Sequence, residues 1–352
     1  MAVRVYLKQA WNLMKQNPLF STLYIVGTGI SIVMTMVIAI VYYVRLAPVY
    51  PETNRMRTLV VKSAKMTNDE STHSANISYA MLKDWFYSLE SAEVSTGVSG
   101  TSYARVTNDK EEIPTYARYT DENFFRVFPL VFLEGKPFTE ADRRSGIHNV
   151  VLTDSYAQQL FGTTKGVVGK NFLMDYTNVK VVGVVKSGSF LTPDSYAQVY
   201  LPYSCRDGYD DEGSHWALGG YRVYILMKES KSVTDVQDEV LELVRKFNVS
   251  DMGDGWKLDL VGQPELYWHS TFRLWSNVAV DWGRVIWMFV GIFMVLLFVP
   301  AFNLSGMISA RMEASYRIWV YVRRLVLPAG GYWYRLSGKI YSLQAWELFS
   351  DW

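Results

Sequence analysis

The sequence predicts an α+β domain, built as two lobes and inserted between two transmembrane α-helices. Two long apolar runs without a charged residue, 19–44 and 285–304, flank a polar middle segment of ordinary composition. Within the middle segment, short strand patterns alternate with short amphipathic helix patterns. We therefore expect transmembrane helices over residues 19–44 and 284–304, and an extracytoplasmic domain over residues 45–283.

The overall composition limits the classes of function. The 352 residues include 35 Lys and Arg against 34 Asp and Glu, so no strong positive field is available, and we expect no nucleic-acid partner. The single cysteine, Cys205, cannot form an intramolecular disulfide, and it lacks the second thiol of a zinc or thiol-exchange pair. We expect Cys205 to be a structural or surface residue.

The first apolar run, Leu19–Val44, is long enough to cross a bilayer, because about 20 apolar residues span a hydrocarbon core of ~30 Å. A cleaved signal peptide would have a shorter apolar region that ends in small residues, whereas residues 45–48 read RLAP. We therefore predict an uncleaved anchor that lies in the lipid bilayer. The small residues Gly27, Gly29 and Ser31 would allow close helix packing, although they are equally typical of an ordinary span.

The second run, Val285–Leu304, is also uncharged, and Pro300 suggests a kink near its end. Basic residues precede the first run and follow the second. The positive-inside rule therefore predicts that both termini lie in the cytoplasm and that residues 45–283 lie outside it, which in a bacterial inner membrane is the periplasm. Residues 1–18 predict an amphipathic helix in the cytoplasmic interface, with a continuation of the first span as the alternative. Residues 305–352 would form a cytoplasmic tail.

The middle segment contains recognisable helix and strand patterns. Helices are predicted where apolar residues recur at helical spacing after a capping residue, and strands where β-branched residues are concentrated. The Gly- and Asp-rich residues 204–220 predict a long loop. The predicted strands are 57–63, 178–186, 197–201 and 222–227, and the predicted helices are 78–89, 122–128, 154–161 with Asp154 as its N-cap, and 233–247.

The sequence does not display a catalytic or metal-binding pattern. The acidic stretch 207–212 lacks the glycine and the final glutamate of a calcium loop, and residues 162–170 (GTTKGVVGK) miss both ends of a phosphate-binding loop. We therefore expect no metal, no cofactor bound by this chain and no enzyme activity. The four histidines, which show no metal-binding spacing, are His73, His148, His215 and His269.

Two segments of the middle region carry a family resemblance. Residues 119–142 read YTDENFFRVFPLVFLEGKPFTEAD, and residues 150–185 contain AQQLFG, then GK, then VVGVV. Both resemble the periplasmic core domain of MacB/FtsX-type ABC transporter permeases, with Lys136 where arginine is usual. The positions that match the family motifs, for which we expect structural roles, are Phe124, Gly135, Phe138, Asp142, Ala157, Leu160, Phe161, Gly162, Gly169 and Gly183.

The resemblance extends to about residue 313 and is greatest to variants common in Bacteroidetes. It implies the membrane subunit of an ABC transporter, a homo- or heterodimer of permeases that transmits the motion of a separate ATPase to the periplasmic domain for export or mechanotransmission. A periplasmic or outer-membrane partner is also implied, as is a cytoplasmic coupling edge at Asn303, Arg311 and Glu313. The alternative is a two-span sensor or scaffold whose outer domain binds a ligand or protein, and a membrane-tethered enzyme is disfavoured.

The last part of the sequence departs from the family pattern. Family members continue with a coupling segment and two more spans, whereas residues 314–352 contain no third apolar run. Codons for residues 317–329 permit the family's Met-Gly-Val-Arg-Lys segment in a shifted reading frame. We therefore expect the tail from about residue 314 to be a frameshift product, with a genuine divergent tail as the alternative. A chain without those spans would not respond to ATP.

Overall fold

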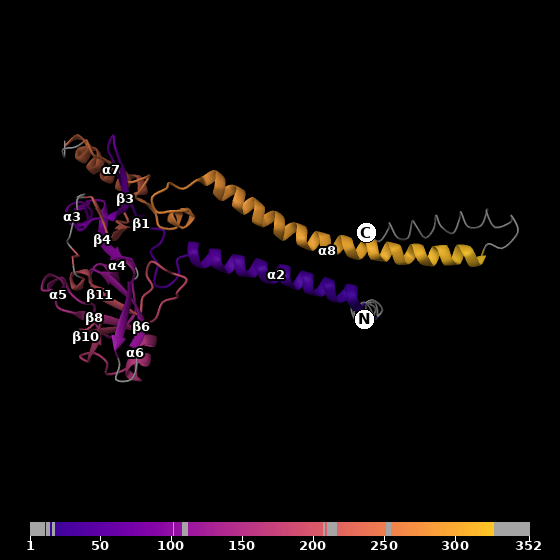
Figure 1. The fold of residues 1–352 in the computed structure, drawn as a ribbon, viewed down its shortest axis with the longest axis horizontal. Coiled ribbons are helices and arrows are strands. Elements are labelled where there is room, and N and C mark those ends of the chain that lie inside the picture. Colours follow the sequence, from indigo (N-terminus) through magenta and orange to yellow (C-terminus); the bar gives the residue numbers. More distant parts are fainter. Residues whose placement is uncertain are drawn as a thin grey trace. The chain divides into compact units, whose positions relative to one another are not determined.

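The computed structural model describes residues 18–100, 102–107, 112–206, 208–209, 217–250 and 255–326, together with Trp11 and Lys15. Residues 37–287 form one compact unit, which includes the end of helix α2 (Pro18–Leu46) and the start of helix α8 (Trp282–Val326). The strands of this unit form two sheets, one in each of two lobes (Figure 1). The prediction of a two-lobed α+β domain is therefore confirmed.

The first lobe, which we call the split lobe, is made of residues 58–99 and 217–267. Its central strands β1 (Thr58–Val61) and β13 (Tyr221–Met227) pair antiparallel and are largely buried, because side chains cover both faces of the sheet. The strand order is β14-β2-β3-β13-β1-β15, with β12 on β3 and β4 on β13. The remaining strands are β2 (Ala64–Thr67), β3 (Thr72–Ile77), β4 (Ala92–Ser99), β12 (Leu218–Gly219), β14 (Lys257–Asp259) and β15 (Glu265–Leu266).

Two predicted helices form on the split lobe. Helix α7 (Val233–Val249) begins with a capping box and buries one face against the sheet. Helix α3 (Tyr79–Asp84) begins after Ser78, whose hydroxyl accepts a hydrogen bond from the Met81 amide at 3.0 Å. The predicted helix 78–89 continues beyond Trp85 only as a 3-10 turn, Phe86–Ser88.

The second lobe, which we call the inserted lobe, is the continuous segment 102–202. Its strand order is β7-β10-β8-β11-β6-β5-β9, and β9 also pairs with β10, so hydrogen bonds join six strands into a closed ring. The strands are β5 (Ser102–Thr107), β6 (Glu112–Thr120), β7 (Phe132–Gly135), β8 (Asn149–Thr153), β9 (Asn171–Met174), β10 (Thr177–Val185) and β11 (Val199–Pro202), and the helices are α4 (Phe124–Val127), α5 (Glu140–Arg144) and α6 (Asp154–Phe161).

The start of helix α6 corrects one prediction. The N-cap is Thr153, the last residue of β8, and Asp154 is the first helical residue. The Asp154 carboxylate instead accepts a hydrogen bond at 2.9 Å from the amide of Ser187, beyond the end of β10. The aspartate therefore ties the helix to the neighbouring strand.

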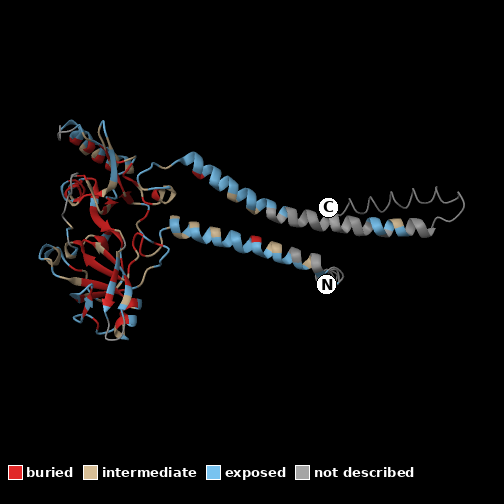
Figure 2. Ribbon diagram, viewed as in Figure 1, coloured by how far each residue is buried: buried red, intermediate tan, exposed pale blue. Residues whose placement is uncertain are grey.

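The two lobes share a hydrophobic core. Helix α4 contributes Phe124 and Phe128, and β13 contributes Tyr224, whose ring centroid lies 5.2 Å from that of Phe128. Figure 2 shows buried residues running through the sheets of both lobes. Because the shared core contains residues of both sheets, relative movement of the lobes would have to break aromatic packing.

Helix α2 fits the first predicted membrane span. Its segment Ile25–Leu46 is the one helix of the described residues long and apolar enough to cross a membrane, and 6% of its most apolar window is buried. In α8 the described apolar stretch is Trp282–Phe298, which is shorter than a full span. Helix α8 is assigned continuously through Pro300 as far as Val326, so it includes the first residues of the expected aberrant tail.

Three predicted segments fall wholly or partly outside the described residues. Of the predicted interfacial helix 1–18, the structure describes Trp11, Lys15 and Pro18, all helical. Residues 210–216 of the predicted loop and residues 327–352 of the tail lie outside the description. These predictions stay predictions.

Candidate functional site at the helix–domain junction

The linker that follows α2 is held by a buried ion pair. Arg55 is 3% exposed and its guanidinium pairs with the carboxylate of Glu52, which is 1% exposed. The same guanidinium donates hydrogen bonds to the carbonyl of Val44 and, at 3.0 Å, to the carbonyl of Ala47. The last carbonyls of a helix have no partner within the helix, so Arg55 caps the C-terminus of α2 from within the domain.

Glu52 extends this connection to the inserted lobe. Its second carboxylate oxygen accepts a hydrogen bond at 2.7 Å from the hydroxyl of Ser195, which lies in the loop between β10 and β11. Burial raises the pKa of Glu52, and the charge of Arg55 partly opposes that rise. A carboxylate in this position needs its cation, so the pair acts as a unit.

The loop residue next to Ser195 is a second buried carboxylate. Asp194 accepts from the ammonium of Lys62 at 3.2 Å and from the guanidinium of Arg222 at 3.1 Å. Burial alone would raise the pKa of Asp194, but the charges of Lys62, Arg222 and Arg118 outweigh it and hold the pKa below its ordinary value. Lys62 follows β1 and Arg222 lies in β13, so Asp194 ties the inserted lobe to the centre of the split lobe.

Arg118 of β6 holds the same loop through its backbone. It is 1% exposed, and its guanidinium donates to the carbonyls of Pro193 at 2.7 Å, Tyr196 at 3.0 Å and Ser99 at 3.2 Å. The ring of Tyr267 completes the arrangement, with the guanidinium carbon of Arg55 5.4 Å and the ammonium of Lys62 5.9 Å from its centroid. We call this set the junction cluster: Glu52, Arg55, Lys62, Arg118, Asp194, Ser195, Arg222 and Tyr267.

The linker that leads into α8 is held in the same manner. Arg273 forms a buried ion pair with Glu265, and its guanidinium donates to the carbonyls of Val278 at 2.7 Å and Val261 at 2.9 Å. Glu265 lies in β15, which pairs with β1. The second linker is therefore fastened to β15, the edge strand that pairs with β1.

The charged groups of the junction cluster satisfy one another. Its carboxylates are saturated by cations and hydroxyls, and no nucleophile lies beside a free base among them. Among the described residues, no group of three His, Cys, Asp or Glu side chains could hold a metal ion. Well-packed charges with several partners each resist displacement, since separating a buried pair costs about 3–5 kcal/mol.

The family-motif residues predicted from sequence lie in the inserted lobe and in the shared core, which also contains Tyr267 of the junction cluster. Phe124 and Phe138 are buried in the shared core, Ala157 and Leu160 in the core of the inserted lobe, and Phe161 packs against it. Asp142 forms the capping box of α5, and Gly162 ends α6 with a φ of 71°.

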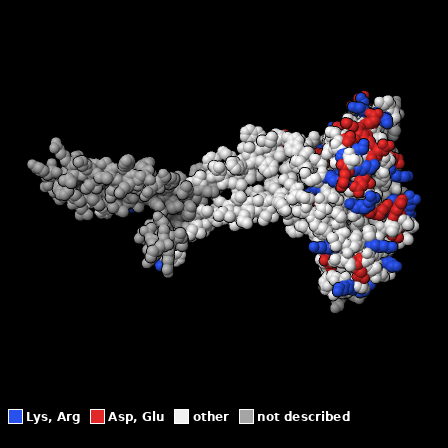
Figure 3. Space-filling model, turned by 180° about the vertical axis from the view of Figure 1, so that it is seen from behind, with Lys and Arg blue, Asp and Glu red and all other residues white. Residues whose placement is uncertain are grey.

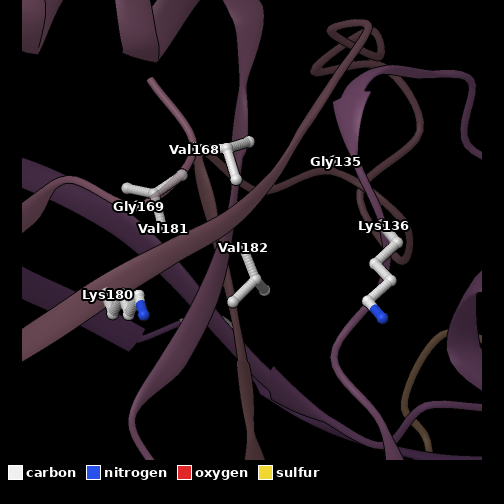
Figure 4. A pocket seen from close by; sticks show the side chains of 7 residues that line it. All are labelled: Gly135, Lys136, Val168, Gly169, Lys180, Val181 and Val182. Atoms are coloured by element: carbon white, nitrogen blue, oxygen red, sulfur yellow. The ribbon is translucent and has the colours of Figure 1, made fainter. Parts of the chain in front are cut away.

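Three of the predicted glycines gather around β10. A Cβ on Gly135, where φ is 71°, would lie 2.1 Å from the carbonyl oxygen of Val182, and Gly135 pairs directly with Gly183. Gly135 and Gly169 line an open hollow of about 500 Å³, flanked by Lys136 and Lys180 (Figure 4). Gly135 and Gly183 thus allow close backbone packing of β7 on β10. At Gly169 a Cβ would meet no atom within 4 Å, and the φ of 91° is what favours glycine there.

The remaining predicted residues lie on the helices. In α2, the hydroxyl of Ser31 donates to the carbonyl of Gly27 at 2.9 Å, and a Cβ on Gly29 would meet no atom within 4 Å. Asn303, Arg311 and Glu313 lie in α8. Their roles in helix packing and in coupling stay predictions.

The junction cluster itself was missed by sequence reasoning. A local signal exists, since Glu52 and Arg55 stand three residues apart directly after the apolar run. Their distant partners carry no such signal: Ser195 is 143 residues from Glu52, and Asp194 is 132 residues from Lys62.

Comparison with known proteins identifies the domain. The family model described as the MacB-like periplasmic core domain matches residues 20–243 of the 352. The chain belongs to the MacB-like periplasmic core domain family. The resemblance seen in the sequence is thereby confirmed.

Curated relatives of this MacB-like chain match it over short segments. A macrolide export ATP-binding/permease protein MacB of Shigella dysenteriae serotype 1 (strain Sd197) is 28% identical over 105 residues, or 30% of this chain and 16% of the relative. A pyoverdine export ATP-binding/permease protein PvdT of Pseudomonas savastanoi pv. phaseolicola (strain 1448A / Race 6) is 29% identical over 113 residues, or 32% of this chain and 16% of the relative. The matches thus span about a sixth of each relative's length.

Solved structures of similar domains were also found. The periplasmic region of MacB from Actinobacillus actinomycetemcomitans aligns at 18% identity with a TM-score of 0.41, covering 56% of this chain and 88% of that one. A domain of a putative permease from Porphyromonas gingivalis aligns at 15% identity with a TM-score of 0.39, covering 58% and 89% respectively.

Proposed function

We propose that this chain is a form of the membrane subunit of an ABC transporter. In the intact subunit, with the coupling segment and two further spans, the motion of a separate ATPase would reach the periplasmic domain through α2. Two findings support the proposal. The chain belongs to the MacB-like family, and relatives that share part of the domain are named export ATP-binding/permease proteins. The sequence of this chain lacks the glycine pattern of a phosphate-binding loop, which is why ATP binding is assigned to a partner.

The proposed orientation puts both termini in the cytoplasm and residues 45–283 in the periplasm. The basic residues that precede α2 and those that follow the apolar part of α8 support it. A dimer of permeases would place two copies of α2 in one membrane, and the small residues Gly27, Gly29 and Ser31 are the candidates for contacts there.

The observation that carries the proposal is the cap of α2 by Arg55. A guanidinium buried in the domain binds the last carbonyls of the membrane helix, and the paired Glu52 binds the inserted lobe through Ser195. Displacement of the end of α2 therefore acts directly on Arg55 and Glu52, and through them on both lobes. Export or mechanotransmission, rather than catalysis in the periplasm, is the activity that such a connection serves.

The test is to purify the full chain from its native membranes in mild detergent and to assay the preparation for ATP hydrolysis. We expect an ABC ATPase to co-purify, and we expect Glu313→Ala and Arg311→Ala, on the predicted coupling edge, to abolish co-purification. Glu93→Ala, a substitution on the exposed surface of the split lobe, is the matched control and should retain it. A correctly inserted chain from which ATPase activity is absent would reject the proposal in favour of a two-span sensor or scaffold.

A further inference from the structure

Two exposed loops of residues 37–287 adjoin the points where the helices meet the domain, and both lack charge. The first, Ser187–Pro193, reads SGSFLTP, and the second, Leu274–Val280, reads LWSNVAV. Phe190 is 74% exposed, and Leu274 and Trp275 are 62% and 67% exposed. Large apolar side chains exposed on the surface of a domain are candidates for an interaction surface.

The first loop is fixed beside the end of α2. The hydroxyl of Tyr50 donates to the carbonyl of Lys186 at 2.8 Å, and a Cβ on Gly188 would lie 3.3 Å from the ring of Pro51. At its other end, Ser195 binds Glu52, whose partner Arg55 caps α2. Phe190 and Leu191 thus lie at the tip of a loop that is anchored to Tyr50 and Pro51, and these two residues follow the end of α2 within five positions.

The second loop leads directly into α8. Arg273 anchors it through the carbonyl of Val278, and Trp282, the first residue of α8, packs against His269 with ring centroids 5.2 Å apart. The apolar surface of the loop continues into the helix, where Ile286 and Trp287 are 61% and 74% exposed.

Lys, Arg, Asp and Glu side chains are spread over much of the domain surface in the view of Figure 3. Neither of the two loops contains one of these residues. The headgroup region extends about 5–8 Å beyond each side of the hydrocarbon core, and aromatic side chains are enriched there. Uncharged loops with exposed Phe, Leu and Trp match the chemistry of that region.

We propose that these two loops, Ser187–Pro193 and Leu274–Val280, insert their apolar tips into the outer surface of the bilayer that α2 crosses. The occupant of this surface is lipid, since the loops continue the exposed apolar surfaces of the membrane helices. The domain would then rest on the membrane at two anchored points beside its helices. The inference assumes the membrane span of the proposed function but requires no ATPase or transport.

The test uses the full chain with Cys205→Ser and single cysteines at Phe190→Cys or Leu274→Cys. Each is labelled with a polarity-sensitive fluorophore and placed in nanodiscs of phosphatidylethanolamine and phosphatidylglycerol. Val249→Cys, at an 83% exposed position on α7, is the aqueous control, and Val33→Cys, 59% exposed on α2, is the lipid control. All these side chains are exposed, so labelling leaves the core of the domain intact.

We expect brominated lipid to quench the labels at positions 190 and 274 as it quenches position 33, while iodide quenches position 249. If positions 190 and 274 behave like position 249 while position 33 is quenched by lipid, the loops are in water and this inference is wrong. If iodide instead reaches position 33, the membrane span itself is overturned, and the proposed function fails with it.

Discussion

Replacement of Arg55 by methionine tests the junction cluster most directly. Arg55→Met removes the ion pair with Glu52 and both hydrogen bonds to the end of α2. It leaves Glu52 buried with Ser195 as its remaining hydrogen-bond partner. Loss of one member of a buried pair costs about 3–5 kcal/mol, so we expect the free energy of unfolding of the domain to fall by that amount.

The destabilisation should depend on pH in a defined direction. Burial already raises the pKa of Glu52, and removal of Arg55 raises it further. In Arg55→Met the folded state therefore takes up a proton more readily than the unfolded chain, so the stability lost at neutral pH returns as the pH falls. The double variant with Glu52→Gln removes the buried charge and should recover much of the loss at neutral pH.

Urea unfolding of the full chain in detergent micelles, followed by tryptophan fluorescence, measures these differences. Arg57→Met is the matched control, because Arg57 also forms ion pairs, with Glu93 and Glu229, but its side chain is 31% exposed and the pairs lie at the surface. Its loss should cost at most about 1 kcal/mol. Equal destabilisation by Arg55→Met and Arg57→Met would refute the reasoning that the junction pair acts as a buried unit.

Three further predictions concern the domain. Burial raises the pKa of Asp121 from 3.8 to about 6, so the free energy of unfolding should fall as the pH rises through that window. Urea titrations at several pH values measure this dependence, and the Asp121→Asn variant should not show it. Gly135→Ala, whose Cβ would meet the carbonyl of Val182, should cost more than about 2 kcal/mol in thermal unfolding, while Gly146→Ala, in open space at a similar φ, costs about 1 kcal/mol. Burial raises the pKa of Cys205 to about 12, so its alkylation at pH 7.5 should be far slower than in the urea-unfolded chain and should accelerate with rising pH.

Local patterns predicted the regular elements well where the pattern was strong. The helical periodicity of α7 and the valine-rich run of β10 gave nearly the observed bounds. Strand β4 was missed, because its sequence AEVSTGVS mixes small polar residues with valine and shows no alternation, although it is almost wholly buried. Its polar side chains are accommodated by a buried neighbour, Asp121, which accepts a hydrogen bond from Thr96 at 2.6 Å.

The candidate site could be predicted only in part, for a physical reason. The motif positions such as Gly135 and Phe124 are set by local backbone and core packing, which leave a trace in the sequence. The junction cluster depends on pairs of charges brought together by strand order, and a lone Glu52 or Asp194 looks like any surface carboxylate until the fold buries it. The order of the strands in the fold, rather than the composition of the sequence, therefore decides which charged side chains are buried and paired.

The interrupted layout of the split lobe has a consequence for how the chain assembles. Strand β1 pairs with β13 and β15, which are synthesised more than a hundred residues later, whereas the inserted lobe is continuous over 102–202. As the chain is synthesised, the inserted lobe can close its ring of strands first, while β1 and β4 wait for β13. The split lobe is then completed only when β15 arrives, shortly before α8 is made.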